Sequence, residues 1–415
     1  MKILLLSVTF PYPPTKGGTQ VRTYNLLKYL QARHEVTVVT QVGADTLEAE
    51  IAILREQVSE LVTFPRPQEL KSDGILGKVG RSLQAWYRGI PTSVLFNQSP
   101  EMQAWVDANL RRFAVVTCEH SVNEVFLPAP CPIPAVVNVH SSVYGSCRQQ
   151  LLTGTASYPL RDWLNLPLLY LYERRYCQKF TAIVVTTEDD RAYLQKFLPN
   201  SASTEPSRNA PDCLDRLVVI PNGVDLTKFP YRSLDPGGMK LVFTGAMDSL
   251  PNIDAAQFLS QTILPAVRQI YPETTLELVG DRPTPAVQEL GKLPGVIVTG
   301  KVDSMVERLH QATIAVLPLR TGLGIKNKTL EALAAGIPVV GSNQALEGLR
   351  VDGNDVPLRA LRANSPSEYV AAISQLFADP SLRRELSKNG RSLMETQFTW
   401  DIAGASYERV LSQTR

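Results

Sequence analysis

Residues 313–336 contain a complete strand–loop–helix unit and read Thr313-Ile314-Ala315-Val316-Leu317-Pro318-Leu319-Arg320-Thr321-Gly322-Leu323-Gly324-Ile325-Lys326-Asn327-Lys328-Thr329-Leu330-Glu331-Ala332-Leu333-Ala334-Ala335-Gly336. The apolar run to Pro318 predicts a strand, and the two glycines that follow it predict a tight loop. A helical pattern then begins at Lys326. The same alternation recurs along all 415 residues, so the sequence predicts an α/β fold with a doubly wound, Rossmann-like sheet in each half.

The turn-rich stretch 234–238 predicts a domain border, with a first domain over 1–225 and a second over 226–399. Two facing sheets leave a central cleft at the carboxyl ends of their strands, where ligands are expected. Strands are expected at 2–8, 35–40, 60–64, 114–118, 134–139, 181–186, 217–220, 240–245, 274–279, 295–299, 313–318 and 337–340. Helices are expected at 19–32, 45–58, 99–111, 159–179, 189–197, 252–269, 302–311, 326–335, 367–378, 380–393 and 400–413.

The overall composition excludes several classes of protein. The 42 basic and 40 acidic residues give a net charge of +2, which provides no global field for nucleic acid. The five cysteines are widely spaced without a Cys-x-x-Cys pair, so neither a disulfide framework nor a metal site is expected, and a reducing cytoplasm fits best. No apolar run of about 18 residues is present, which excludes an ordinary transmembrane helix.

The loop and helix start at 320–328 predict an anion site. Lys326 and Lys328 fall in the first helical turn, where the partial positive charge of the helix N-terminus makes lysine unfavourable. A bound phosphate resolves this conflict, with Gly322 and Gly324 exposing backbone amides and Arg320 adding a forked contact. The alternative is an ordinary helix with solvated charges. We favour phosphate binding because glycines and three basic residues occur together at the N-terminus of one helix.

Glu331 follows Lys328 by three residues on nearly the same helix face, where its carboxylate can accept hydrogen bonds from sugar hydroxyls or simply pair with the lysine. Gly17 and Gly18 lie between the first strand and the first helix. They either let the backbone approach an anion or form a flexible surface turn, and spacing alone leaves both readings open. The third glycine of a dinucleotide fingerprint is missing.

His120 and His140 each follow a predicted strand, so both are expected on the rim of the cleft, where an imidazole can donate to a substrate oxygen. Each alone is as readily a structural loop residue, but together they are candidate site residues. The acidic run 188–190 opens a helix and is interpreted as a helix cap rather than a metal site. A basic amphipathic segment, 71–88, either rests on an anionic bilayer as a peripheral contact or covers the sheet.

The sequence resembles the GT-B glycosyltransferases, specifically glycosyltransferase family 4, over nearly its whole length. Each matching piece is short, but their order is that of the family. The pieces are Met1–Gly18, Val219–Asp225, Leu241–Gly245, Leu278–Gly280, Lys328–Ala334 and Glu347–Leu349.

This resemblance implies a retaining hexosyltransferase that uses a UDP- or GDP-sugar without a tightly bound metal or cofactor. It implies that Glu331 binds the ribose, that Val302 meets the base through its backbone, and that the 322–328 and Gly17-Gly18 loops flank the diphosphate. It further implies that His120 is the histidine near the transferred sugar and that His140 is its neighbour. In the family the last helix, here 400–415, returns to the first, acceptor-binding domain, and the second domain binds the donor.

Two departures from the family pattern concern the sugar and the diphosphate. Leu323 stands where many members carry a first glutamate, eight residues before Glu331. The stretch 245–252 lacks the arginine and lysine that commonly hold the diphosphate, and Arg320, Lys326 and Lys328 are expected to replace them. A sugar-nucleotide epimerase of the same architecture and a catalytically decayed nucleotide-binding protein are the alternatives. The acceptor, a glycolipid, a polysaccharide precursor or a small metabolite, and the oligomeric state stay open.

Overall fold

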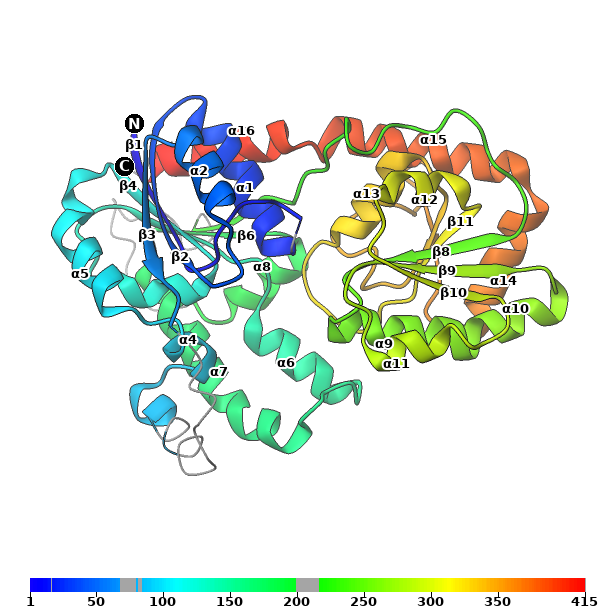
Figure 1. Cartoon of the computed structure of the whole chain (residues 1–415), viewed down its shortest axis with the longest axis horizontal. Coiled ribbons are helices and arrows are strands. Elements are labelled where there is room, and N and C mark those ends of the chain that lie inside the picture. The colour runs from blue at the N-terminus through cyan, green and yellow to red at the C-terminus, as the bar shows by residue number, and fades with distance from the viewer. Residues whose placement is uncertain (16, 68–79, 81–83, 199–215, 415) are drawn as a thin grey trace. The chain divides into compact units, whose positions relative to one another are not determined.

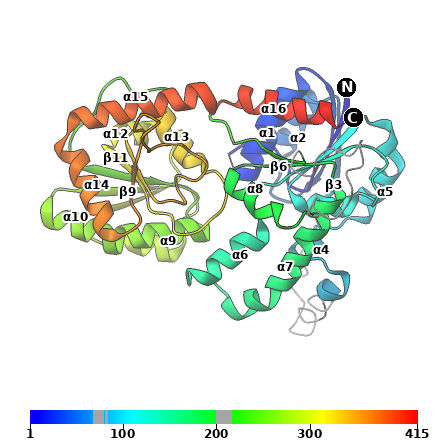
Figure 2. The same cartoon turned by 180° about the vertical axis from the view of Figure 1, so that it is seen from behind.

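The computed structural model describes residues 1–15, 17–67, 80, 84–198 and 216–414, which form two compact units (Figures 1 and 2). Unit 1 consists of Met1–Arg148, Tyr158–Pro221 and Ala403–Arg415, and unit 2 consists of Gln149–Ser157 and Asn222–Ile402. Most of the basic segment 71–88 and all of residues 200–211, a stretch of serines and prolines without periodicity, lie outside the described residues.

Unit 1 contains a seven-stranded parallel sheet in the order β3-β2-β1-β4-β5-β6-β7. Its central strands are buried at every residue, as β4 and β5 show, because helices cover both sides of the sheet. All seven predicted strands of this half are confirmed. They are β1 (Lys2–Ser7), β2 (Glu35–Val42), β3 (Glu60–Pro65), β4 (Val115–Glu119), β5 (Ala135–Asn138), β6 (Ala182–Val185) and β7 (Leu217–Val219).

The helices of the first half lie close to their predicted ranges. They are α1 (Gly18–Gln31), α2 (Glu48–Gln57), α5 (Pro100–Asn109), α7 (Pro159–Lys179) and α8 (Glu188–Gln195). Thr187 caps α8, and the acidic run 188–190 occupies its first turn, as the capping interpretation predicted. Three elements were not predicted, since they are short or lack apolar periodicity: α4 (Thr92–Leu95), the 3₁₀ helix Ser121–Phe126 and α6 (Val143–Leu152).

Unit 2 contains a six-stranded parallel sheet in the order β10-β9-β8-β11-β12-β13. The strands are β8 (Lys240–Thr244), β9 (Thr275–Val279), β10 (Val296–Gly300), β11 (Ile314–Leu317), β12 (Val339–Gly341) and β13 (Leu361–Arg362). The helices are α9 (Leu250–Phe258), α10 (Leu264–Ile270), α11 (Pro285–Leu290), α12 (Met305–Gln311), α13 (Asn327–Ala335), α14 (Pro366–Ala378), α15 (Pro380–Gln397) and α16 (Trp400–Gln413). Only β13 and α11 were not predicted, and a π-helical segment, Leu259–Ile263, joins α9 to α10.

The strand order locates a possible ligand crevice in each unit. In unit 1 the order reverses between β1 and β4, and in unit 2 it reverses between β8 and β11. Ligands of doubly wound sheets bind outside the carboxyl ends of the strands at such a reversal. The loops after these four strands are therefore where functional side chains are expected.

Most of the last helix, α16, packs within unit 1. A Cβ built on Gly404 would lie 2.2 Å from the ring of Tyr29, so the helix approaches α1 closely there. His34 Nε2 lies 2.7 Å from Glu408 Oε1, and the Tyr407 hydroxyl donates to Glu119 over 3.0 Å. These contacts join the chain's end to α1 and to the end of β4.

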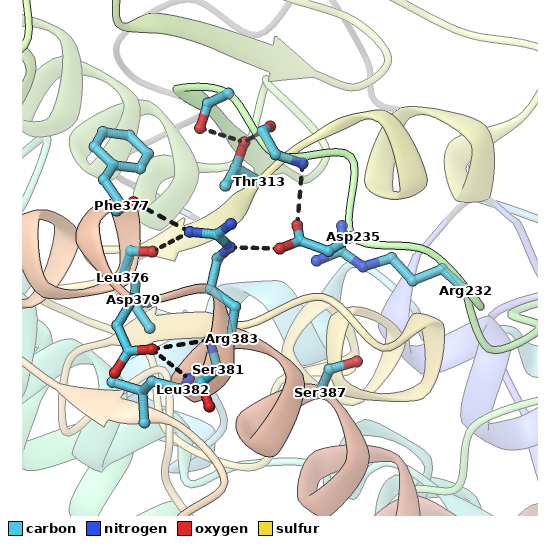
Figure 3. A network of polar contacts seen from close by, with 12 residues as sticks. Arg232, Asp235, Thr313, Leu376, Phe377, Asp379, Ser381, Leu382, Arg383 and Ser387 are labelled. Carbon is cyan, nitrogen blue, oxygen red and sulfur yellow. Dashed lines mark hydrogen bonds and ion pairs between the residues drawn. The ribbon is translucent and has the colours of Figure 1, made fainter.

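The connection before β8 is fastened to unit 2 by a buried polar network (Figure 3). Arg383 donates to the Asp235 carboxylate over 2.7 Å and to the carbonyl of Leu376 at the end of α14. Thr313 donates to the carbonyl of Gly237 over 2.6 Å. The predicted turn 234–238 is therefore attached to this unit by hydrogen bonds, and Gly237 adopts a positive φ of 64°.

The described part of the chain can be searched for metal sites, membrane-spanning helices and disulfides. There, no group of three or more His, Cys, Asp or Glu side chains could hold a metal ion. None of the described helices is both long enough and apolar enough to span a bilayer. The four described cysteines, 118, 131, 147 and 177, are free thiols.

Candidate functional site

The unit 2 site is built by the loops after β8 and β11. The first loop runs from Gly245 to the start of α9, and the second runs from Pro318 to Lys326, which is the N-cap of α13. Gly322 and Gly324 adopt φ values of 101° and 82°, a region that favours glycine, so the predicted tight loop does require them. α13 ends at Gly336, whose left-handed conformation (φ 76°) closes the helix.

Lys328 is the central cation of this site. The residue as a whole is partly exposed, and its ammonium donates to Asn252 Oδ1 and lies 4.4 Å from the centroid of the Phe243 ring. Burial lowers the pKa of Lys328 to about 7, although Glu331 acts in the opposite direction. A desolvated lysine with few anionic partners gains strongly from a bound anion, so Lys328 is suited to receive a phosphate.

Glu331 lies one turn after Lys328 on α13, as predicted. Burial raises the pKa of its carboxyl group to about 7, and the nearby Lys328 opposes this shift. Both side chains therefore change their protonation state near neutral pH. A carboxylate placed so close to a buried cation can accept hydrogen bonds from ligand hydroxyls once the cation is neutralised by an anion.

Lys326 and Gly324 contact the carboxylate of Glu347, which belongs to a family-like piece of the sequence but was not predicted to face them. Glu347 accepts a hydrogen bond of 2.9 Å from the backbone N–H of Gly324, and its second oxygen lies 3.3 Å from Lys326 Nζ. Glu347 follows β12 and is buried. The Gly324 amide, expected to face an anion, is thus occupied by an internal carboxylate, and Lys326 is partly neutralised.

Arg320 also faces a carboxylate. Its guanidinium forms a forked ion pair with Asp254 on α9, with Nε 2.9 Å from Oδ2, and it lies 5.2 Å from the centroid of Phe258. The forked contact predicted for phosphate is therefore made to Asp254 in this structure. The contribution of Arg320 to diphosphate binding stays a prediction.

The floor of the unit 2 site is made of backbone. A Cβ on Gly280, after β9, would lie 1.7 Å from the carbonyl oxygen of Gly245, and a Cβ on Gly245 would lie 2.6 Å from Lys328 Nζ. No side chain fits at either position without displacing the other loop or the lysine. The two glycines thus add no side chain of their own to the surroundings of Lys328 and Asn252.

Val302 and the glycine pair at 17 and 18 have less defined surroundings. Val302 follows β10 and packs, half-buried, against the unit 2 core. Gly17 is the N-cap of α1 with an extended φ of 175°, and a Cβ there would meet Gln20 at an ordinary 3.6 Å. The backbone at Gly17 therefore does not require glycine, and the ligand roles of Gly17, Gly18 and Val302 stay predictions.

The unit 1 site contains the two predicted histidines, which the structure brings together. His120 follows β4 and His140 follows β5, and their rings meet edge to face with centroids 5.5 Å apart. His120 has a positive φ of 80°, and in the described structure no group hydrogen-bonds to its buried Nδ1. Burial lowers the pKa of His120 to about 3 and also lowers that of His140, so His120 acts as a neutral imidazole.

A buried carboxylate supports this histidine pair. Glu119, whose side chain is completely buried, accepts hydrogen bonds from Asn138 and Tyr407, each 3.0 Å long, and lies 3.9 Å from His140 Nε2. Arg22 of α1 donates to Asn138 over 2.9 Å and is itself fully buried, which lowers the pKa of its guanidinium to about 10. This network fixes the ends of β4 and β5, and hence both imidazoles.

Sequence reasoning did not identify the roles of Glu119, Arg22, Tyr407, Asn252 or Glu347. Two of them left a signal. Arg22 lies four residues before Leu26 on the apolar face of α1, where an unpaired charge would be costly. Tyr407 lies on the buried face of α16. The partners of both come from distant strands, which periodicity cannot indicate.

Comparison with known proteins now decides the family. The Glycosyltransferase Family 4 profile matches residues 16–228, which is half of the chain, and the profile for Glycosyl transferases group 1 matches residues 238–379. The chain belongs to glycosyltransferase family 4. The two family segments fall mainly on units 1 and 2, respectively, so both sites described above lie in family 4 sequence.

One curated relative matches nearly the whole of this family 4 chain. An exopolysaccharide phosphotransferase of Streptomyces coelicolor is 24% identical over 420 residues, which cover 96% of this chain and 39% of the relative. The chain thus spans well under half the length of that protein.

Solved structures show the same fold at low identity. A sucrose-phosphate synthase from Thermosynechococcus elongatus superposes with a TM-score of 0.71 at 18% identity, covering 99% of this chain and 98% of the other. Anabaena HepE in complex with UDP-glucose superposes with a TM-score of 0.65 at 14% identity and covers all of both chains. These matches confirm the predicted GT-B fold of two Rossmann-like domains.

Proposed function

We propose that this family 4 chain is a retaining glycosyltransferase that moves a hexosyl unit from a nucleotide-diphospho-sugar to a hydroxyl acceptor. The observation that carries the proposal is the desolvated Lys328 in the first turn of α13, with Glu331 one turn further along the helix and with glycines at 245 and 280 that add no side chain to this end of the sheet. An anion and a polyol are the two groups that this pair of side chains binds best.

In this proposal the donor's diphosphate binds at Lys328 and at the N-terminus of α13, where the helix dipole favours negative charge. Glu331 accepts hydrogen bonds from the ribose, and the backbone at Val302 contacts the base. Lys326 and Arg320 come to face the phosphates by exchanging their carboxylate partners, Glu347 and Asp254, for the ligand. The Gly17-Gly18 loop flanks the diphosphate, and unit 2 is the donor-binding domain.

The reaction that follows is a displacement at the anomeric carbon. The bond between that carbon and the phosphate oxygen breaks while Lys328 and the α13 amides stabilise the charge on the departing nucleoside diphosphate. The acceptor hydroxyl then forms the new glycosidic bond on the same face, and its proton passes to the leaving phosphate. His120, a neutral imidazole, donates a hydrogen bond to the transferred sugar, and His140 supports it.

The proposed donor is either a UDP-sugar or a GDP-sugar, because the residues described above bind groups that both donors carry. The structure of HepE is a complex with UDP-glucose, which supports a nucleotide-sugar as the donor. A UDP-sugar and a GDP-sugar both carry the diphosphate that Lys328 would bind and the ribose hydroxyls that Glu331 would bind. The acceptor is a glycolipid, a polysaccharide precursor or a small metabolite. The free thiols agree with our proposal of a reducing cytoplasm as the compartment.

The test is transfer of labelled sugar from UDP- and GDP-hexoses to a panel of hydroxyl acceptors, with release of nucleoside diphosphate measured in parallel. Lys328→Met and Glu331→Gln should each reduce turnover at least about 100-fold, whereas Lys388→Met, an exposed lysine on α15, should leave it unchanged. Wild-type turnover in the first two variants would overturn the proposal. Epimerised donor without transfer would instead identify an epimerase, and nucleotide binding without any reaction would identify a decayed enzyme, as Leu323 could suggest.

A further inference from the structure

The side chain of Asn252, on α9, is a buried amide that joins two elements of unit 2. Its Nδ2 donates to the carbonyl of Ala246 over 2.8 Å, and its Oδ1 accepts a hydrogen bond from the Lys328 ammonium. The helix holds its backbone in place, because the Asn252 N–H donates over 2.9 Å to the carbonyl of Ser249, the N-cap of α9. Asn252 therefore connects the loop after β8 to the first turn of α13.

The orientation of this amide is determined by its two partners. The Ala246 carbonyl can only accept and the Lys328 ammonium can only donate, so a flipped amide would lose both hydrogen bonds. Gly245 permits the arrangement, since a Cβ there would lie 2.6 Å from Lys328 Nζ and 2.7 Å from Asn252 Nδ2. Asparagine suits the position, because an aspartate carboxylate cannot donate to Ala246 and a leucine can neither donate nor accept.

Lys328 differs from the other two cations of the site in the charge of its partner. Arg320 and Lys326 are each ion-paired with a carboxylate. Within the described residues Lys328 forms no ion pair, and its ammonium is held by the neutral Asn252 amide and by the face of the Phe243 ring. A neutral partner fixes the ammonium without neutralising it, so an incoming anion does not have to displace a carboxylate.

We propose that Asn252 is a positioning residue that holds the Lys328 ammonium in place for an anion and leaves its charge available. The inference rests on the proposed function, in which that anion is the diphosphate of the donor. The phosphate then meets an ammonium that is already placed and not yet neutralised. A carboxylate at position 252 would instead pair with Lys328 and repel the phosphate.

The first test measures the ionisation of Lys328 in the ligand-free chain, from the pH dependence of its acetylation by acetic anhydride, read by peptide mass spectrometry. Burial lowers the pKa of Lys328 to about 7, while Glu331 raises it and Lys326 lowers it, so the wild-type midpoint should lie near pH 7. Asn252→Asp should raise this midpoint by at least about 1 pH unit, because a carboxylate stabilises the ammonium. Asn252→Leu should lower it, because the ammonium loses its hydrogen-bond acceptor.

The second test measures the binding of UDP-glucose and GDP-mannose by isothermal titration calorimetry. Asn252→Asp should weaken binding of the preferred donor at least about tenfold at pH 7 through repulsion of the diphosphate. Asn252→Leu should also weaken it about tenfold, because leucine cannot hold the ammonium in place. At pH 8, Asn252→Asp should abolish the proton uptake that accompanies binding, because Lys328 is then already protonated.

The matched control is Asn389→Asp. Asn389 is a half-buried residue on α15 whose amide donates to the Leu358 carbonyl over 2.9 Å, so the substitution removes the same kind of hydrogen bond away from Lys328. It should leave the acetylation midpoint and the donor affinity unchanged. Unchanged circular dichroism and thermal midpoint establish that each variant is folded.

The two tests separate the role of Asn252 from the proposed reaction. Opposite shifts of the Lys328 midpoint in Asn252→Asp and Asn252→Leu, with weaker donor binding in both, support the proposal. A midpoint that stays in place in both variants, donor affinity like that of wild type in both, or equal changes in Asn389→Asp would overturn it. If wild type bound neither nucleotide-sugar while the midpoint shifts were present, the proposed function would fail and the holding of Lys328 by Asn252 would be supported.

Discussion

The coupled ionisation of Lys328 and Glu331 predicts an unusual pH signature for donor binding. Both groups have a pKa of about 7 in the ligand-free chain, whereas the proposed complex needs an ammonium for the diphosphate and a carboxylate for the ribose. Binding must therefore protonate Lys328 above neutral pH and ionise Glu331 below it. A nucleotide-diphospho-sugar is a suitable probe because both phosphates are esterified and do not titrate near neutral pH.

The size of the effect follows from these pKa values. At pH 8, Lys328 takes up about 0.9 proton and Glu331 releases about 0.1, which gives a net uptake of about 0.8 proton. At pH 6 the same arithmetic gives a net release of about 0.8, and near pH 7 the two cancel. The affinity should be highest near pH 7, about threefold lower at pH 6 or pH 8, and about tenfold lower for each further pH unit.

The assay is isothermal titration calorimetry in pairs of buffers with different ionisation enthalpies, which gives the number of protons exchanged. Lys328→Met should abolish the uptake and leave the release, and Glu331→Gln should abolish the release and leave the uptake. Proton exchange that does not change sign between pH 6 and pH 8, or that is the same in both variants as in wild type, would refute this reasoning.

Three further predictions concern the frame around the sites. Gly280→Ala should destabilise unit 2 by about 1–3 kcal/mol or more, measured by urea unfolding, because its Cβ would overlap the Gly245 carbonyl. Tyr407→Phe should cost about 1–3 kcal/mol by the same measurement, because the buried Glu119 carboxylate loses a hydrogen-bond donor. His120→Asn should lower kcat about 100-fold in the transfer assay at unchanged thermal midpoint, because asparagine tolerates the positive φ but lacks the imidazole.

The two stability variants each have a matched control in the chain. Gly17→Ala should be nearly neutral in unfolding, since its Cβ meets only an ordinary contact. Tyr87→Phe removes a hydroxyl from a ring that is 92% exposed and should leave stability unchanged. Equal stability losses in Gly17→Ala and Gly280→Ala, or in the two tyrosine variants, would contradict the packing described here, and wild-type turnover of His120→Asn would remove His120 from the site.

The fold was largely predictable because its strands are buried on both faces. A stretch such as Ala135–Val137 is apolar at every position, which is typical of a strand in a parallel sheet covered on both faces, so its sequence identifies it directly. The helix α6 escaped prediction because Val143–Leu152 has polar residues and a glycine where an apolar face would be expected. The short β13 has only two residues, too few for a period to be recognised.

The site was predictable in its residues but not in its pairings. The pattern at 320–331 indicated the cations, the glycines and Glu331, because helix-dipole conflict is a local property. That Arg320 faces Asp254, 66 residues earlier, and that Glu347 takes the Gly324 amide are consequences of how β8, β11 and β12 assemble. The position of His120 beside His140 was predictable from their common place after neighbouring strands, whereas the depressed pKa of His120 depends on burial that the sequence does not display.

A crystal structure of the chain soaked with a nucleotide-diphospho-sugar would test the central claim most directly. The account predicts the diphosphate within hydrogen-bonding distance of Lys328 Nζ and the first amides of α13, and a ribose hydroxyl on the Glu331 carboxylate. Density for the nucleotide elsewhere, with Lys328 still bonded to Asn252 and Glu331 without a ligand hydroxyl, would contradict it.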